Sequence, residues 1–90
     1  MPVIPVKYYV YILECADKSF YTGITIDLKR RFNEHSSGQG AHYTASRKPL
    51  KIVYYERKKD RGLALKREAE IKRWPRAKKL ALIHSGRNVI

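Results

Sequence analysis

Aromatic and β-branched residues gather near the start of the chain in two short runs that a polar turn separates. The first run is Lys7–Glu14 and the second is Phe20–Thr25, with the polar residues 16–19 between them. Such residues favour strands, and two runs joined by a short polar segment are typical of a β-hairpin. The pattern therefore predicts two neighbouring antiparallel strands.

The two predicted strands bring tyrosines together. With a hairpin loop of about three to five residues near Ala16, we expect Tyr11 to lie opposite Tyr21. Because alternate residues of a strand share a face, Tyr9 and Gly23 belong to that same face. Two phenol groups are then expected to stand side by side.

A first helix is predicted directly after the hairpin, with Asp27 as its N-cap. Leu28 and Phe32 mark the buried side of this helix. At roughly 100° per residue, Arg31 and His35 fall beside them and also form an i,i+4 pair. Two polar side chains are therefore expected to face the sheet.

The second half of the chain continues with a loop, a strand and two helices. Residues 38–49 contain two glycines and a proline without an apolar period, which indicates a loop. Leu50–Glu56 is predicted as a strand, Asp60–Trp74 as a helix with its cap, and Pro75–Gly86 as a further helix. The predicted order is β-β-α-β-α-α, an α+β arrangement.

One carboxylate conflicts with the apolar pattern of the second helix. Ala64, Leu65, Ile71 and Trp74 outline an apolar arc, and Glu68 lies near its centre. A buried carboxylate without a partner costs roughly several kcal/mol, and a metal ion or an arginine is the usual compensation. The sequence therefore predicts a special partner for this glutamate.

The composition makes nucleic acid the expected partner. The 90 residues suffice for one domain, which we assign to residues 1–90 with an ordered core at about 6–86. Twenty Lys and Arg against eight Asp and Glu give a formal net charge of +12. A field of this sign suits a polyanionic partner.

Other classes of protein are excluded by what the sequence lacks. It has no run of about 18 apolar residues for a membrane span, and residues 1–6 are too short for a signal peptide, so we expect a cytoplasmic protein. The basic segments lack an opposite face of exposed Trp or Phe, so we expect no membrane binding. Cys15 is the only cysteine, which excludes a disulfide within the chain and a thiolate zinc site.

Three motifs resemble the GIY-YIG nuclease superfamily: Tyr9-Val10-Tyr11, then Tyr21-Thr22-Gly23, then Arg31 eight residues after the glycine. Tyr9-Val10 stand where the family name has Gly-Ile, Thr22 stands where it has Ile, and both tyrosines are retained. The segments 42–49 and 68–74 have counterparts in the small stand-alone bacterial members. The resemblance covers nearly the whole chain.

The resemblance implies a three-stranded antiparallel sheet flanked by helices and a metal-dependent endonuclease that hydrolyses phosphodiester bonds in DNA repair or processing. It places Tyr11, Tyr21, Arg31 and Glu68 at the active-site positions of the family. Glu68 would hold one divalent ion, Mg²⁺ or Mn²⁺, and a salt bridge to Arg31 is the structural alternative for this residue.

The chemistry of hydrolysis suits these residues. A tyrosine with a pKa of about 10 needs roughly 4 kcal/mol of phenolate stabilisation to act as a base at neutral pH. Nearby Arg31 and a metal could supply it, and either Tyr11 or Tyr21 would take the proton from water. Arg31 would contact the scissile phosphate, and His35 would assist at the leaving group or the phosphate.

The wider basic surface is expected to bind the phosphate backbone of a nucleic acid, DNA in preference to RNA. We expect the protein to act as a monomer. The residues assigned to this surface are Arg30, Arg47, Lys48, Lys72 and Arg73.

Two alternatives to a nuclease remain open at the level of the sequence. Many relatives carry an asparagine near the end of the domain, and Asn88 is only a loose positional candidate for it. A catalytically inactive nucleic-acid-binding module of the same fold is therefore the principal alternative. A purely structural, ribosome-associated role would use the charge but leaves Glu68 unexplained.

Overall fold

The computed structural model describes residues 7–39 and 47–86, and they form a three-stranded sheet with helices on both faces. The sheet is antiparallel with the strand order β2-β1-β3. This arrangement confirms the expected α+β class and order of elements. The elements are β1 (Tyr8–Cys15), β2 (Phe20–Thr25), α1 (Leu28–Ser36), β3 (Pro49–Lys58), α3 (Arg61–Lys72) and α4 (Arg76–Ser85).

The register of the hairpin differs from the expected one. Tyr11 pairs with Gly23, and Tyr21 pairs with Leu13, so the two tyrosines are not directly opposite each other. The turn lies later than predicted because Lys18 adopts a left-handed φ of 70° and the Cys15 amide bonds the Ser19 carbonyl. A shift of two residues keeps every side chain on its predicted face, whereas a shift of one would have exchanged the faces.

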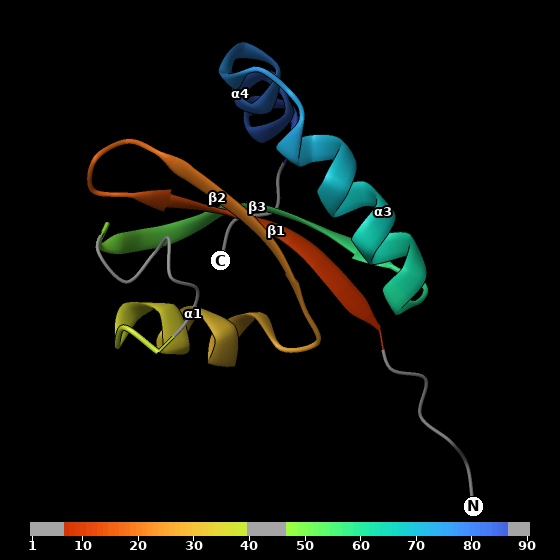
Figure 1. Cartoon of the computed structure of the whole chain (residues 1–90), viewed down its shortest axis with the longest axis horizontal. Coiled ribbons are helices and arrows are strands. Elements are labelled where there is room, and N and C mark those ends of the chain that lie inside the picture. Colours follow the sequence, from red (N-terminus) through yellow and green to blue (C-terminus); the bar gives the residue numbers. More distant parts are fainter. Residues whose placement is uncertain (1–6, 40–46, 87–90) are drawn as a thin grey trace, which may run out of the picture.

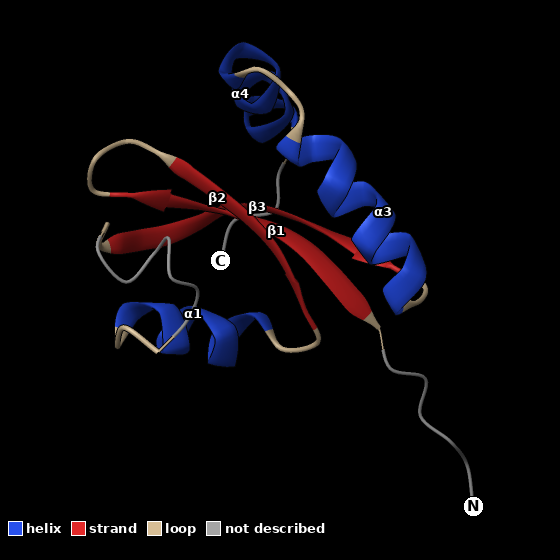
Figure 2. Cartoon of the chain, viewed as in Figure 1, coloured by secondary structure: helices blue, strands red, loops and turns tan. Residues whose placement is uncertain are grey.

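The helices divide between the two faces of the sheet (Figure 1). On one face α1 covers a cluster built on Tyr11, Leu13 and Ile52. On the other face α3 and α4 cover a second cluster, to which β1 contributes Val10 and Ile12. Figure 2 shows the central strand β1 between both layers, and its alternating residues supply both cores.

The helix boundaries follow from the predicted caps. Asp27 Oδ1 accepts a hydrogen bond from the Arg30 amide at 3.0 Å, and Asp60 Oδ1 accepts one from the Leu63 amide at 2.9 Å. Each satisfies an amide that the helix leaves unpaired. Leu65 of α3 is 37% exposed, so its assignment to the buried arc was wrong.

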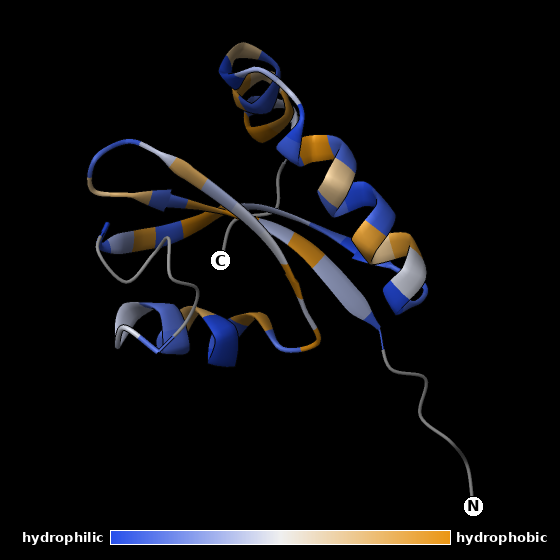
Figure 3. Cartoon of the chain, in the orientation of Figure 1, coloured by the Kyte–Doolittle hydropathy of each residue, from blue (hydrophilic) through white to orange (hydrophobic). Residues whose placement is uncertain are grey.

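Figure 3 shows hydrophobic and hydrophilic residues interspersed along α3. Ala64 and Ile71 are fully buried against the sheet, as the pattern predicted. Within residues 7–39 and 47–86, no helix is long and apolar enough to cross a membrane.

Candidate active site

A hydrogen bond between β1 and α1 forms the centre of the site. The hydroxyl oxygen of Tyr11 lies 2.9 Å from His35 Nε2, and both side chains are 1% exposed. His35 reaches this position because it follows Leu28 and Phe32 on the buried side of α1, as predicted. The strand therefore supplies a phenol and the helix an imidazole in one buried contact.

Gly23 makes room for the phenol of Tyr11. A Cβ atom at this position would lie 2.6 Å from the Tyr11 hydroxyl oxygen and 3.1 Å from Cε2 of Tyr21. Contacts that short would displace both rings, so the close packing of the two tyrosines over β2 requires glycine. The sequence pattern placed Gly23 on this face but did not indicate the contact.

Tyr21 and Tyr11 flank the imidazole. The ring centroids of Tyr11 and Tyr21 are 6.4 Å apart, and the Tyr21 ring lies 5.2 Å from that of His35. Tyr21 is half-buried, in contrast to Tyr11. The two phenols therefore lie side by side, as expected, although the two residues are diagonal neighbours on adjacent strands and not directly opposite each other.

Burial controls the ionisation of the central pair. It raises the pKa of Tyr11 to about 12, although a side-chain hydrogen bond from Arg31 acts in the opposite direction. Burial, together with the charge of Arg31, lowers the pKa of His35 to about 4. At neutral pH the pair is therefore an uncharged phenol and an uncharged imidazole.

Arg31 brings a permanent positive charge to this pair. Its Nη1 donates to Glu34 Oε1 at 2.9 Å, and its side chain is 31% exposed. The hydrogen bond to Glu34 is the main reason that its pKa is raised. The Tyr11 hydroxyl therefore has two partners in the site, His35 Nε2 and the guanidinium of Arg31, which can only donate.

Glu68 lies at the edge of the same site with a partner other than the one expected. Its Oε2 is 3.2 Å from Lys72 Nζ, and its side chain is 17% exposed. The alternative of a salt bridge to Arg31 is therefore wrong, because Arg31 pairs with Glu34. The negative charge of Glu68 nevertheless acts on Tyr11 and contributes to raising its pKa.

Lys72 connects Glu68 to the tyrosines. Its Nζ lies 5.9 Å from the ring centroid of Tyr21 while it pairs with Glu68. An i,i+4 spacing of Glu and Lys along a helix is the signal that could have predicted this pair. The sequence assigned Lys72 to phosphate binding alone and so missed this second contact.

The donor set suits a metal ion that takes few ligands from the protein. In the part of the chain that the structure describes, no three His, Cys, Asp or Glu side chains are grouped as metal ligands. Glu68 would therefore supply a single carboxylate, at a place where the cationic Nζ of Lys72 already lies 3.2 Å away. Mg²⁺ is commonly held by one or two carboxylates, with water and substrate phosphate oxygens completing its shell.

The predicted phosphate-binding residues are spread over three places. Arg30 lies near the start of α1, 3.9 Å from Glu34. Arg47 lies at the hairpin turn, 3.4 Å from Asp17, and Lys48 precedes β3. Lys72 and Arg73 end α3. Asn88 falls outside the described residues.

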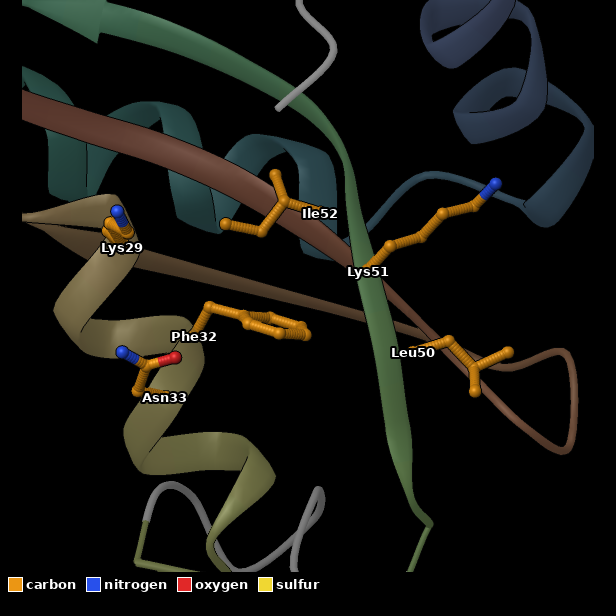
Figure 4. A pocket seen from close by; sticks show the side chains of 6 residues that line it. All are labelled: Lys29, Phe32, Asn33, Leu50, Lys51 and Ile52. Atoms are coloured by element: carbon orange, nitrogen blue, oxygen red, sulfur yellow. The ribbon is translucent and has the colours of Figure 1, made fainter.

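A hollow of about 310 Å³ lies between α1 and β3, and no tyrosine lines it. Figure 4 shows Phe32 and Ile52 on its inner side and Lys29 at its rim. Its lining residues are Lys29, Phe32, Asn33, Leu50, Lys51 and Ile52. This lining holds no carboxylate, histidine or phenol, and its ionisable side chains are Lys29 and Lys51.

Residues 7–81 match the protein family described as GIY-YIG catalytic domain, and the chain belongs to this family. The domain is thus that of a nuclease superfamily, as the motifs indicated. The match covers every helix and strand up to the middle of α4.

Several relatives extend over nearly the whole chain. The UPF0213 protein of Syntrophus aciditrophicus is 54% identical over 78 residues, which make up 86% of this chain and 90% of that protein. The solution NMR structure of the UPF0213 protein from Bacillus halodurans is 44% identical, with a TM-score of 0.56 over 87% of this chain and 83% of that chain. The solution NMR structure of a protein from E. faecalis is 38% identical, with a TM-score of 0.60 over 93% of both chains.

Proposed function

We propose that this protein is a divalent-metal-dependent endonuclease that hydrolyses phosphodiester bonds of nucleic acid, DNA in preference to RNA. The proposal rests on one observation above all: two tyrosines, a histidine and an arginine meet on one face of the sheet, with the carboxylate of Glu68 acting on them. The net charge of +12 favours a polyanionic substrate for this site.

Arg31 is the group that binds the scissile phosphate. Its planar guanidinium forms paired hydrogen bonds with phosphate oxygens and stays charged at any working pH. Its present partner Glu34 is three residues away on the same helix, and both side chains are about one-third exposed. A pair of this kind is worth roughly a few tenths of a kcal/mol, so a phosphate can replace the carboxylate.

Tyr21 is the phenol that takes the proton from the attacking water. Tyr11 is buried with a pKa of about 12, and bringing that pKa near 7 would require roughly 7 kcal/mol of added phenolate stabilisation. Tyr21 is half-buried and has the ammonium group of Lys72 near its ring. Water therefore reaches Tyr21 more readily than Tyr11, which is only 1% exposed.

Tyr11 and His35 act as positioning residues in this proposal. In this proposal the neutral imidazole accepts a hydrogen bond from the Tyr11 hydroxyl, and the phenol oxygen in turn accepts a hydrogen bond from Arg31. The buried pair thereby fixes the direction in which Arg31 presents its remaining donors. His35 holds Tyr11 and does not itself contact the leaving group.

Glu68 would hold the metal ion, which when bound supplies a Lewis acid at the phosphate. In the unloaded protein the Lys72 ammonium neutralises this carboxylate. Lys72 is 51% exposed and turns to solvent at little cost when another cation takes its place. The exchange would leave its charge close to the backbone of the substrate.

The proposal is tested by incubating duplex, nicked, branched and single-stranded DNA and RNA with the protein in Mg²⁺, Mn²⁺ or EDTA. Wild-type protein is compared with Glu68→Ala and with the matched control Glu70→Ala, which removes a carboxylate from the solvent side of the same helix. We expect metal-dependent cleavage by the wild type and the control and none by Glu68→Ala. Binding without cleavage by all three proteins would refute the proposal and favour an inactive module.

A further inference from the structure

An aromatic and basic patch continues the face of the sheet that carries the candidate active site. Tyr9 and Arg57 pair across β1 and β3, and the next pair along the same face is Tyr11 and Tyr55. In Figure 1 this end of the sheet, where β1 starts and β3 ends, extends beyond α1. The proposed phosphate site and the patch are therefore neighbours on one surface.

The three side chains of the patch contact one another. The ring centroids of Tyr9 and Tyr55 lie 5.8 Å apart with their planes at 70°. The guanidinium carbon of Arg57 lies 5.9 Å from the centroid of Tyr9. Both tyrosines are half-buried and Arg57 is exposed. Flat groups therefore reach the surface, although Tyr55 also packs against the core cluster around Tyr11.

The charge around the patch is positive. Lys7 directly precedes β1 and Lys59 directly follows β3, so both lie at this end of the sheet. Both are exposed, and neither they nor Arg57 form an ion pair with another described residue. Planar aromatic and guanidinium groups beside such cations are the means by which proteins bind unpaired nucleotides.

We propose that Tyr9, Tyr55 and Arg57 form a stacking platform for an unpaired nucleobase of the strand that the adjacent site cuts. The inference rests on the proposed nuclease function and specifies its substrate class as single-stranded segments or frayed branches. The bases of an intact duplex are stacked on each other and offer the platform no free face. Cleavage therefore prefers substrates with unpaired nucleotides beside the scissile bond.

The platform is tested by binding alone, in EDTA, so that no cleavage is required. Fluorescence anisotropy compares a labelled oligothymidylate with a duplex of equal length for wild type, Tyr9→Leu and Tyr9→Phe. Loss of one stacking side chain should weaken single-strand binding about tenfold. We expect this loss for Tyr9→Leu, little change for either variant on duplex, and near wild-type binding for Tyr9→Phe, which keeps the ring.

Arg57→Leu provides a second variant, with Lys66→Leu as its matched control because Lys66 is an exposed cation on α3. Arg57→Leu should weaken single-strand binding more than duplex binding, whereas Lys66→Leu should affect both equally. Thermal unfolding of each protein establishes that it is folded at the temperature of the assay. Equal loss on both substrates for Tyr9→Leu and Arg57→Leu, or no loss on either, would overturn the platform.

The test of the stacking platform and the test of the nuclease function can fail independently of each other. Selective loss of single-strand binding without metal-dependent cleavage by the wild type would retain the platform and reject the nuclease. Cleavage that depends on Glu68, combined with wild-type binding by Tyr9→Leu, would retain the nuclease and reject the platform.

Discussion

Two tyrosine-centred polar clusters lie on opposite faces of the same sheet, and they differ in how completely their members satisfy one another. The difference lies in the hydrogen bonds and ion pairs that the side chains of each cluster form among themselves. On the α1 face the cluster contains Tyr11, His35 and Arg31. On the α3 face a second cluster contains Tyr54, Glu56 and Arg67. The pKa of each tyrosine is raised by burial to about 12.

The cluster on the α3 face is closed. Glu56 accepts from Arg67 Nε at 2.8 Å and from the Tyr54 hydroxyl at 2.5 Å, and it lies 3.1 Å from Lys58 Nζ. Arg67 also pairs with Glu70, and its guanidinium carbon lies 5.0 Å from the ring centroid of Trp74. Every charge has an opposite charge beside it, so the cluster joins α3 to β3 and has no group left for a ligand.

The cluster on the α1 face is open on one side. Its histidine is neutral, and among the described residues its arginine forms an ion pair only with Glu34, whose carboxylate is about one-third exposed. Tyr21 lies half-buried beside it. A tyrosine and an arginine thus stabilise the fold where a carboxylate, that of Glu56, forms hydrogen bonds to both. In the cluster on the α1 face an imidazole stands in place of that carboxylate, and we propose that this leaves Arg31 free to act on an external phosphate.

A large difference in cleavage rate is expected from removing single hydroxyl groups on the α1 face. Tyr21→Phe should slow single-turnover cleavage about 100-fold or more, because it removes the proposed base. Tyr11→Phe should slow cleavage less, about tenfold, because it removes only the contact that positions Arg31. Rates measured at several pH values make the test, and a larger loss for Tyr11→Phe would reverse the two roles.

A pH-dependent loss of stability should come from His35 on the α1 face between pH 6.5 and about 4. The pKa of His35 falls from 6.5 to about 4 on folding, so in this window the unfolded chain binds a proton that the folded protein does not. The free energy of unfolding should therefore decrease as the pH falls, by up to about 3 kcal/mol. Urea unfolding of wild type and His35→Gln measures it, and an unchanged slope in the variant would contradict the assignment.

A smaller effect should come from the closed cluster at lower pH. Burial acts to raise the pKa of Glu56, but hydrogen bonds from Arg67, Tyr54 and Lys58 outweigh it and lower the pKa below its ordinary value of 4.5. Its contribution is therefore present above that value and lost only as the pH falls further. Glu56→Gln should cost about 1–2 kcal/mol at pH 7 and leave cleavage intact. Unchanged stability together with lost cleavage would contradict this role.

Local patterns were enough to predict the elements and the faces of most site residues. Strand alternation placed Tyr11 and Tyr21 on one face, and helical periodicity placed Arg31 and His35 beside Phe32. These features depend on spacing within one element or one hairpin. The predicted faces of the hairpin residues remain correct although the register of β1 and β2 differs from the expected one, because the difference is an even number of residues.

Contacts between distant elements could not be predicted in this way. Arg67 is 11 residues from Glu56, and their contact depends on how α3 rotates when it packs on β3. Glu68 directly follows Arg67 in α3, so the direction in which its side chain points depends on the same rotation of the helix. The sequence identified it as a carboxylate in need of a partner, but Lys72 rather than Arg31 fills that role in this structure.

The central claim is that the open cluster acts on substrate and the closed cluster stabilises the fold. Parallel measurement of single-turnover cleavage and of the thermal unfolding midpoint for Arg31→Ala and Arg67→Ala tests it most directly. Arg31→Ala should lose cleavage by about 100- to 1,000-fold with a nearly unchanged midpoint, whereas Arg67→Ala should unfold at lower temperature and still cleave while it is folded. Wild-type cleavage by Arg31→Ala, or its abolition in folded Arg67→Ala, would contradict the account.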